Sequence, residues 1–153
     1  MWQGSLLAIH TAPELRVLMT AHQTANLRAG IGIEGDRYAL GTGKYSAFPD
    51  IRDVTLIEIE TIEALKRDHD ADLPLHEHRR NLTTRGVPLN HLVGKRFWVG
   101  PVLLEGGRLN LPCRYLDMVT GRAVFELLTH RSGLNCRIVT GGEISLGDTI
   151  RPE

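Results

Sequence analysis

The chain has 153 residues, the length of one domain, and its 42% hydrophobic and 24% charged residues are typical of a globular protein. These proportions exclude a disordered or fibrous chain. The formal net charge is zero, so we expect neither nucleic acid nor a membrane surface as a partner.

Arginine dominates the basic residues, because it supplies 15 of the 18 cationic side chains. Its planar fork binds phosphate or carboxylate through two hydrogen bonds, so the bias permits a small anionic ligand. An arginine-rich genome is the alternative explanation.

The sequence carries no sign of a targeting or membrane segment. The first residues, MWQGSLLAIH, have no basic stretch before their short apolar run, which argues against a signal peptide. No segment approaches the roughly 18 apolar residues that cross a bilayer. Cys113 and Cys136 are too few for a disulfide scaffold and lack the paired spacing of a zinc site. We expect one domain over residues 1–153, in the cytoplasm, with reduced thiols; a single disulfide between Cys113 and Cys136 is the alternative.

Glycine and proline recur at short intervals and divide the chain into short elements. The runs that read as strands are 5–12, 17–27, 53–59, 80–84, 96–100, 101–111, 136–140 and 147–152. Helices are predicted over 56–70, where apolar residues recur at helical spacing, and over 121–131. Residues 41–50 form a long polar loop of the kind that is functional or disordered. The predicted fold is mainly β and barrel-like, with two or three short helices and a pocket at the barrel mouth.

The segment HEHRRNLTTRG (76–86) holds the first candidate site residues. If it is a strand, alternation places Arg79 and Asn81 on one face, where a guanidinium and an amide suit a ligand with a phosphate and a heterocycle. A solvated polar edge strand is the alternative. His76 and His78 are two residues apart, but nothing nearby completes a metal site, so we expect exposed histidines.

Asp36 and Arg37 are adjacent charges in a glycine-rich loop whose order is not that of a P-loop. Two interpretations remain open: a loop that holds phosphate, or a turn with a local ion pair.

Cys113 follows Pro112 and precedes Arg114. Nearby arginines lower a thiol pKa if they lie close in space, and the resulting thiolate attacks sulfur or binds a soft metal. His130 is a candidate neighbour. The alternative is an inert cysteine that only fills space.

Five motifs that follow one another along the chain favour the functional interpretation of Cys113. They are GIEGDRYALGTGKYS, VTLIEIETIEAL, RRNLTTRGVPLNHLVGKRFWVG, LPCRYLD and HRSGLNCRIVTGGEISLGDTI. Together they resemble the MOSC domain, named for the C-terminal domain of molybdenum cofactor sulfurases, over residues 4–151. The resemblance implies a barrel related to the small barrel of pyruvate kinase. It also implies a pocket for the molybdenum cofactor, a pterin dithiolene that ends in a phosphate. Among the motif positions, the resemblance implies Cys113 as the molybdenum ligand and catalytic residue, and as cofactor-binding residues Arg79, Asn81, Arg37, His130 and Arg131. The glycines Gly141, Gly142 and Gly147, with Asp148, match a closing hairpin that we expect to be structural.

The departures from the family are informative as well. The chain has no room for the pyridoxal-phosphate domain of full sulfurases, so we expect no pyridoxal phosphate. It also lacks the N-terminal barrel half of the mitochondrial amidoxime-reducing component and the C-terminal extension of bacterial relatives that reduce N-hydroxylated purines. No flavin or iron–sulfur motif is present, so electrons would come from a partner reductase.

Three functions follow from the resemblance. The first is a molybdenum-dependent oxidoreductase that reduces N-hydroxylated substrates, with the metal on Cys113. The second is a sulfur carrier, in which a desulfurase loads a persulfide on Cys113 for delivery to a metallocentre. The third is a non-catalytic module that binds the cofactor.

Overall fold

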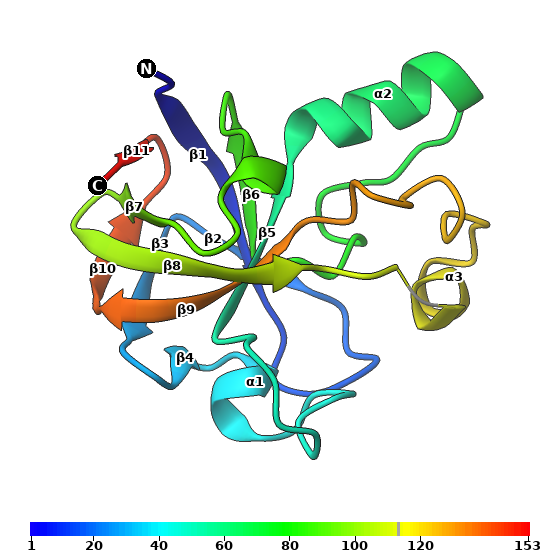
Figure 1. Ribbon diagram of the computed structural model, residues 1–153. Helices are drawn as coiled ribbons and strands as arrows, with labels where there is room; N and C mark the ends of the chain where they lie inside the picture. Colours follow the sequence, from blue (N-terminus) through cyan, green and yellow to red (C-terminus); the bar gives the residue numbers. More distant parts are fainter. Residues whose placement is uncertain (113) are drawn as a thin grey trace.

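Seven strands close into a barrel in the computed structural model, which describes residues 1–112 and 114–153. Around the barrel the order is β1 (Gly4–Thr11), β11 (Thr149–Pro152), β7 (Arg96–Val99), β8 (Val102–Leu109), β9 (Leu134–Thr140), β5 (Val54–Glu58) and β6 (Leu82–Arg85), which returns to β1. The ring closes where Gly4 lies opposite Ile150 and Ser5 opposite Thr149, and both chain ends lie on that side in Figure 1. The predicted mainly β barrel is therefore confirmed.

The remaining strands lie outside this ring. The short β2 (Thr20–His22) pairs with β1, and a second sheet contains β10 (Gly142–Ser145), β3 (Thr24–Arg28) and β4 (Gly32–Ile33). The predicted strand 17–27 is thus two strands in different sheets. A turn at Gly147 joins β10 to β11, but these strands do not pair, so the expected closing hairpin is a connection between two sheets.

One strand pair in the barrel is parallel, β5 with β6, while the other neighbours are antiparallel. A parallel pair needs a crossover, and here the crossover contains α2 (Ile59–His69). The helix begins directly after β5 and ends at Asp70, whose left-handed φ of 50° breaks it. The helix predicted over 56–70 is therefore confirmed within narrower bounds.

The other helices are short: α1 (Arg37–Leu40), the 3₁₀ turn η1 (Leu89–His91) and α3 (Arg114–Thr120). The prediction of a helix over 121–131 is wrong, because this segment is a series of turns. Gly121 has a φ of 67° and follows the last residue of α3. Val124 and Leu128, which supply the helical spacing, are joined by one isolated α-turn.

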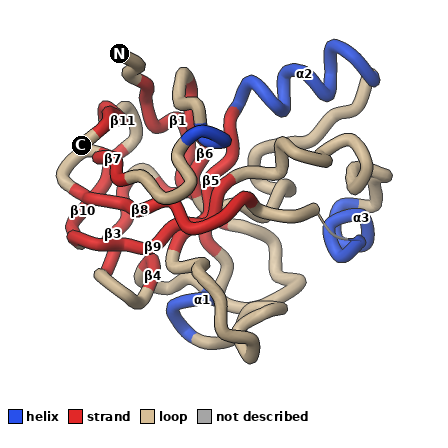
Figure 2. The backbone as a smooth tube through the Cα atoms, in the orientation of Figure 1, coloured by secondary structure: helices blue, strands red, loops and turns tan. Residues whose placement is uncertain are grey.

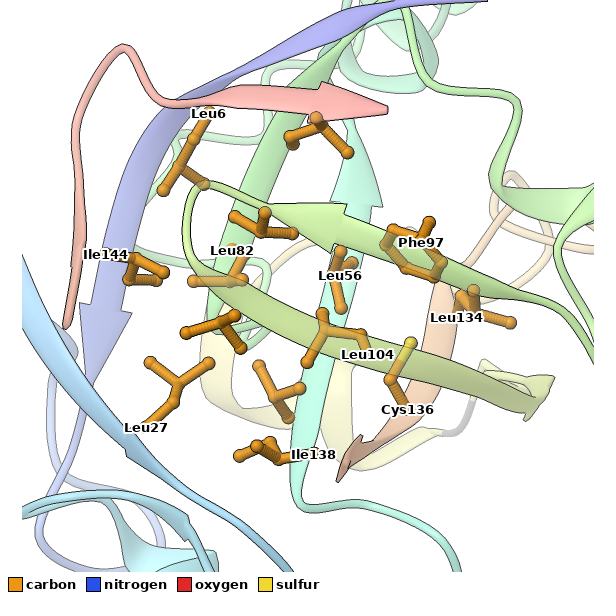
Figure 3. Packing of buried hydrophobic residues seen from close by; sticks show 14 of the residues in the cluster. Leu6, Leu27, Leu56, Leu82, Phe97, Leu104, Leu134, Cys136, Ile138 and Ile144 are labelled. Atoms are coloured by element: carbon orange, nitrogen blue, oxygen red, sulfur yellow. The ribbon is translucent and has the colours of Figure 1, made fainter. Parts of the chain in front are cut away.

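Apolar side chains fill the barrel interior, as strand alternation requires. Figure 3 shows Leu56, Leu82, Leu104 and Leu134 pointing toward one another from four strands. Cys136 lies among them with no exposed surface, and burial raises the pKa of its thiol. This cysteine is therefore a small core residue, as we expect from the sequence.

A second apolar cluster lies between β5, α2, α3 and the turns that follow α3, with Ile57, Leu65, Leu116 and Leu128 as members. It holds these outer segments against the barrel. The long loops gather on the side of α1 and α3, away from the chain ends (Figure 2). Among the described residues, no helix is long and apolar enough to cross a membrane.

Replacing Leu104 by alanine should destabilise the fold by about 2–5 kcal/mol, because its fully buried side chain leaves a cavity inside the barrel. Urea unfolding measures this as a lower midpoint. The matched control is Leu40→Ala, since Leu40 is 55% exposed and its truncation should change stability by less than about 0.5 kcal/mol. Equal losses in the two variants would contradict the assigned core.

Candidate functional site

A cavity of about 410 Å³ opens among the loops beside the barrel. Its wall comes from α1 and the long loop after it, from the residues before β6, from the end of β8 and the segment after it, and from α3. Basic and aromatic side chains dominate its lining: Arg37, Arg52, Arg79, Arg80, Arg108, Tyr38, Tyr45, Phe48 and Tyr115. Asp50 is the one acidic residue among the described lining residues. The arrangement favours an anion that carries a ring or another flat apolar part.

Arg79 is the most unusual of these side chains. Its backbone adopts a left-handed φ of 66°, a conformation that costs a residue other than glycine about 1–3 kcal/mol. One guanidinium nitrogen, Nη1, donates to the carbonyl of Val17. Nε and Nη2 are buried and have no hydrogen-bond partner among the described residues. Burial, and then the nearby Arg37, lower the pKa of this guanidinium. A buried donor pair without acceptors is costly unless an anion binds it.

Arg37 lies beside Arg79 and is 4% exposed. Its Nη1 donates to Asp36 Oδ1 over 3.0 Å and its Nη2 donates to the carbonyl of Arg79 over 2.9 Å. Asp36 also caps α1 by accepting from the backbone N–H of Tyr38. Of the two interpretations open for this position, the local ion pair is present, and it holds one wall of the cavity.

Arg80 is held by protein groups. Its Nε donates to the carbonyl of Ser132 over 2.9 Å, its Nη2 to Ser132 Oγ over 2.7 Å, and its Nη1 to the carbonyl of His78 over 3.1 Å. Gly133, which follows Ser132, has a φ of 111°, and a Cβ there would lie 2.1 Å from the carbonyl oxygen of Leu56. A side chain at residue 133 would therefore shift the adjacent Ser132, which accepts from Nε and Nη2 of Arg80.

Asp50 joins two cavity arginines. Its carboxylate accepts from Arg52 Nη2 over 2.9 Å and from Arg108 Nε over 3.0 Å, and it also pairs with Arg108 Nη2. The hydrogen bonds from Arg108 are the main reason that the pKa of Asp50 lies well below its usual range. The carboxylate ties the long loop to the end of β8 and compensates part of the positive charge.

Asn81 does not share a strand face with Arg79, because β6 begins only at Leu82. The predicted start of the strand at residue 80 is wrong, since Arg79 breaks the extended conformation. Asn81 is fully buried; its Oδ1 accepts from Thr55 N and Thr55 Oγ1, and its Nδ2 donates to the carbonyl of His10, each over 3.1 Å. It fixes Thr55, which lines the cavity.

The two histidines of this segment differ from each other. His76 is about half exposed, as expected, but His78 is fully buried, so that part of the prediction is wrong. His78 Nδ1 accepts from the backbone N–H of Arg80 and its Nε2 contacts Thr83 Oγ1 over 3.0 Å. Burial is the main cause that lowers its pKa. Over residues 1–112 and 114–153, no three His, Cys, Asp or Glu side chains gather as a metal site.

The comparisons with known proteins decide the family. A family model described as "MOSC domain" matches residues 43–151. The chain belongs to the MOSC domain family. No curated protein matches it.

Several solved structures share the MOSC fold with this chain. The YUAD protein from Bacillus subtilis has a TM-score of 0.81 at 17% identity, with 98% of this chain and 97% of that chain covered. YiiM from Geobacillus stearothermophilus has a TM-score of 0.75 at 12% identity, with 98% of this chain and 75% of that chain covered. YiiM from Escherichia coli has a TM-score of 0.70 at 17% identity, with 100% and 70% covered.

The MOSC motif positions fall in different places. Arg37 and Arg79 line the cavity and touch each other, whereas Asn81 contacts its wall through Thr55. His130 is exposed and its carbonyl accepts from Asn90 Nδ2, and Arg131 Nε donates to the carbonyl of Leu127. Neither of these two residues is a lining residue, and their contact with a cofactor stays a prediction.

Cys113 lies outside the described residues. Its sequence neighbour Pro112 lines the cavity, as does Tyr115. Its role as a metal ligand therefore stays a prediction.

Sequence reasoning missed Arg52, Arg80 and the tyrosines of the cavity. The long loop at 41–50 was the one available signal, because such loops are often functional, and it brings Tyr45 and Phe48 to the cavity. Strand alternation would place Arg80 on the opposite face from Arg79, but β6 begins only at Leu82, so alternation does not apply to Arg80.

The Asp50→Asn variant should have a lower Tm than the unchanged protein near neutral pH. A lowered pKa in the folded state stabilises the fold above the unfolded pKa, near 3.8, and this contribution disappears as the pH falls through the folded value. The difference in Tm should therefore be constant above about pH 5 and shrink as the pH falls from about 4 to about 2, as thermal unfolding followed by circular dichroism would measure. Glu143→Gln, at an exposed position on β10, is the control and should leave Tm unchanged. A difference that stays constant over this pH range would contradict the role of the carboxylate.

Proposed function

We propose that this MOSC domain binds the molybdenum cofactor in the arginine-lined cavity and acts as a reductase of N-hydroxylated substrates. The observation that carries the proposal is Arg79, a cavity residue with two buried guanidinium nitrogens that have no partner among the described residues. Such a pair matches the geometry of two oxygens on a phosphate or carboxylate.

The residues present fit the cofactor in three respects. The orphaned edge of Arg79 suits the terminal phosphate. The flat side chains of Tyr38, Tyr45 and Tyr115 suit a ring system. A cavity of about 410 Å³ lies within the usual range for small-molecule sites.

Each cavity group has a distinct task in this proposal. Arg79 binds the phosphate, and Arg37 adds a second positive charge while holding the Arg79 carbonyl. Asp50 accepts from both Arg52 and Arg108, which keeps the long loop in place. The loop then excludes water from its side of the cavity. Asn81 holds Thr55 in the cavity wall.

We assign the metal-binding role to Cys113, because it follows the lining residue Pro112 in the sequence and matches the position of the family's cysteine ligand. When bound, the cofactor supplies a molybdenum centre that exchanges oxygen and electrons with a substrate. The chain carries no flavin or iron–sulfur motif, so the proposal includes a partner reductase as electron donor. A sulfur carrier loaded by a desulfurase and a non-catalytic binding module are the competing functions.

Protein purified from a host that makes the cofactor should contain about one molybdenum per chain, and Cys113→Ala and Arg79→Gln should lose most of it. Elemental analysis and fluorescence of the released oxidised pterin measure the metal and the organic part separately. Cys136→Ala is the matched control, because Cys136 is buried in the barrel core and should not affect metal content.

The outcomes separate the candidate functions. Bound molybdenum with turnover of an N-hydroxylated compound and a chemical reductant supports the reductase, whereas bound molybdenum without turnover supports the binding module. A mass increment of one sulfur on Cys113, without molybdenum or pterin, would replace the proposal with the sulfur carrier.

A further inference from the structure

A buried carboxylate stands behind the two cavity arginines that touch each other. Asp36 has no exposed surface, and its oxygens accept from three donors: Ala12 N over 3.2 Å, Tyr38 N over 3.3 Å and Arg37 Nη1 over 3.0 Å. The backbone of Arg37 in turn donates to the carbonyl of Ala12 over 2.7 Å. The carboxylate is thereby fixed to the end of β1, which is part of the barrel.

From Asp36 the contacts continue to Arg79. Arg37 uses one end of its fork for the carboxylate and the other for the carbonyl of Arg79. That carbonyl belongs to a residue in a left-handed conformation, which persists only where the surroundings hold it. The conformation also sets the direction in which the Arg79 side chain leaves the backbone. Arg37 therefore transmits the position of Asp36 to the guanidinium of Arg79.

The charges of Asp36, Arg37 and Arg79 also favour an anion site at Arg79. Arg37 and Arg79 are both more than nine-tenths buried, so their mutual repulsion is weakly screened. Asp36 pairs with Arg37, and the acidic lining residue Asp50 is engaged with Arg52 and Arg108. One carboxylate against two guanidiniums leaves a net positive charge for an incoming anion.

We propose that Asp36 is a positioning residue of the anion site, which acts through Arg37 to fix Arg79 with its Nε and Nη2 available to one oxyanion. Nε and Nη2 form one edge of the guanidinium fork, while Nη1 is held by Val17 on the other side. The inference rests on the proposed function, because the oxyanion is the phosphate of the bound ligand. A helix cap alone would not need this arrangement, since capping uses only the contact with Tyr38.

The test uses Asp36→Asn in the full chain, with inorganic phosphate as the probe. The variant should bind phosphate about tenfold more weakly in a calorimetric titration, because a charge-assisted contact that orients the site is lost. In ¹⁵N-edited NMR spectra, the Nε–H signal of Arg79, assigned from its absence in Arg79→Lys, should lose its protection against solvent exchange. This signal reports the ordering of the guanidinium, which a general loss of stability in a still-folded variant would not change selectively.

The matched control is Asp117→Asn. Asp117 also accepts two backbone N–H groups, from Val124 over 2.8 Å and Phe125 over 2.9 Å, but lies in α3 and does not line the cavity. The Asp117→Asn substitution should change neither the affinity for phosphate nor the Nε–H signal of Arg79. If Asp36→Asn does not fold, Arg37→Lys keeps both backbone contacts of Asp36 but cannot bridge to the Arg79 carbonyl, and it should also abolish the protection of Arg79 Nε–H.

Unchanged phosphate affinity and an unchanged Arg79 signal in Asp36→Asn would overturn the positioning role. If Arg79→Gln nevertheless abolishes phosphate binding in that case, Arg79 is still the anion site. Failure of the unchanged protein to bind phosphate or cofactor would instead count against the proposed function, while the Arg79 signal in Asp36→Asn would still decide whether the carboxylate orders the guanidinium.

Discussion

The parallel pairing of β5 with β6 is the constraint from which the site follows. Two parallel neighbours cannot be joined by a tight turn, so the chain must leave the barrel, pass through α2 and return along residues 70–81. The returning segment enters β6 from outside the barrel and brings Arg79 and Arg80 with it immediately before the strand begins. A simple hairpin at this position would leave no chain to carry these side chains. The barrel supplies a rigid frame, and the crossover supplies two of the cavity arginines.

Several guanidiniums around one cavity repel one another unless acceptors stabilise their positive charge. In this structure most of the acceptors are backbone carbonyl groups. Carbonyl groups of Val17, Ser132, His78 and Arg79 accept from these side chains, so the positive charge is solvated by fixed dipoles. Two carboxylates add to this: Asp36 pairs with Arg37 from behind the cavity wall, and Asp50 pairs with Arg108 in the wall itself. Arg79 is the exception, because one edge of its fork has no acceptor among the described residues. This difference separates the structural arginines from the one suited to a ligand.

The barrel and α2 could be predicted from the sequence because both depend on local patterns. Short apolar runs between glycines and prolines mark the strands, and apolar spacing with late basic residues marks the helix. The turns after α3 were mistaken for a helix, since Val124 and Leu128 have helical spacing although one isolated turn satisfies it. Arg79 and Asn81 were chosen as candidates on a strand geometry that the left-handed Arg79 prevents, and only Arg79 lines the cavity. The anchoring of Arg80 by Ser132 joins residues 52 positions apart, and no local pattern encodes such a contact.

The two cysteines of the chain offer an experimental handle. Cys136 is enclosed by hydrocarbon inside the barrel, and its thiol is kept protonated by burial. A thiolate attacks an alkylating reagent only where the reagent can reach the sulfur. Cys136 therefore does not react while the protein is folded. An adduct formed on the native chain therefore reports on Cys113 alone, and its rate can follow the chemistry of that single sulfur without any substitution in the protein.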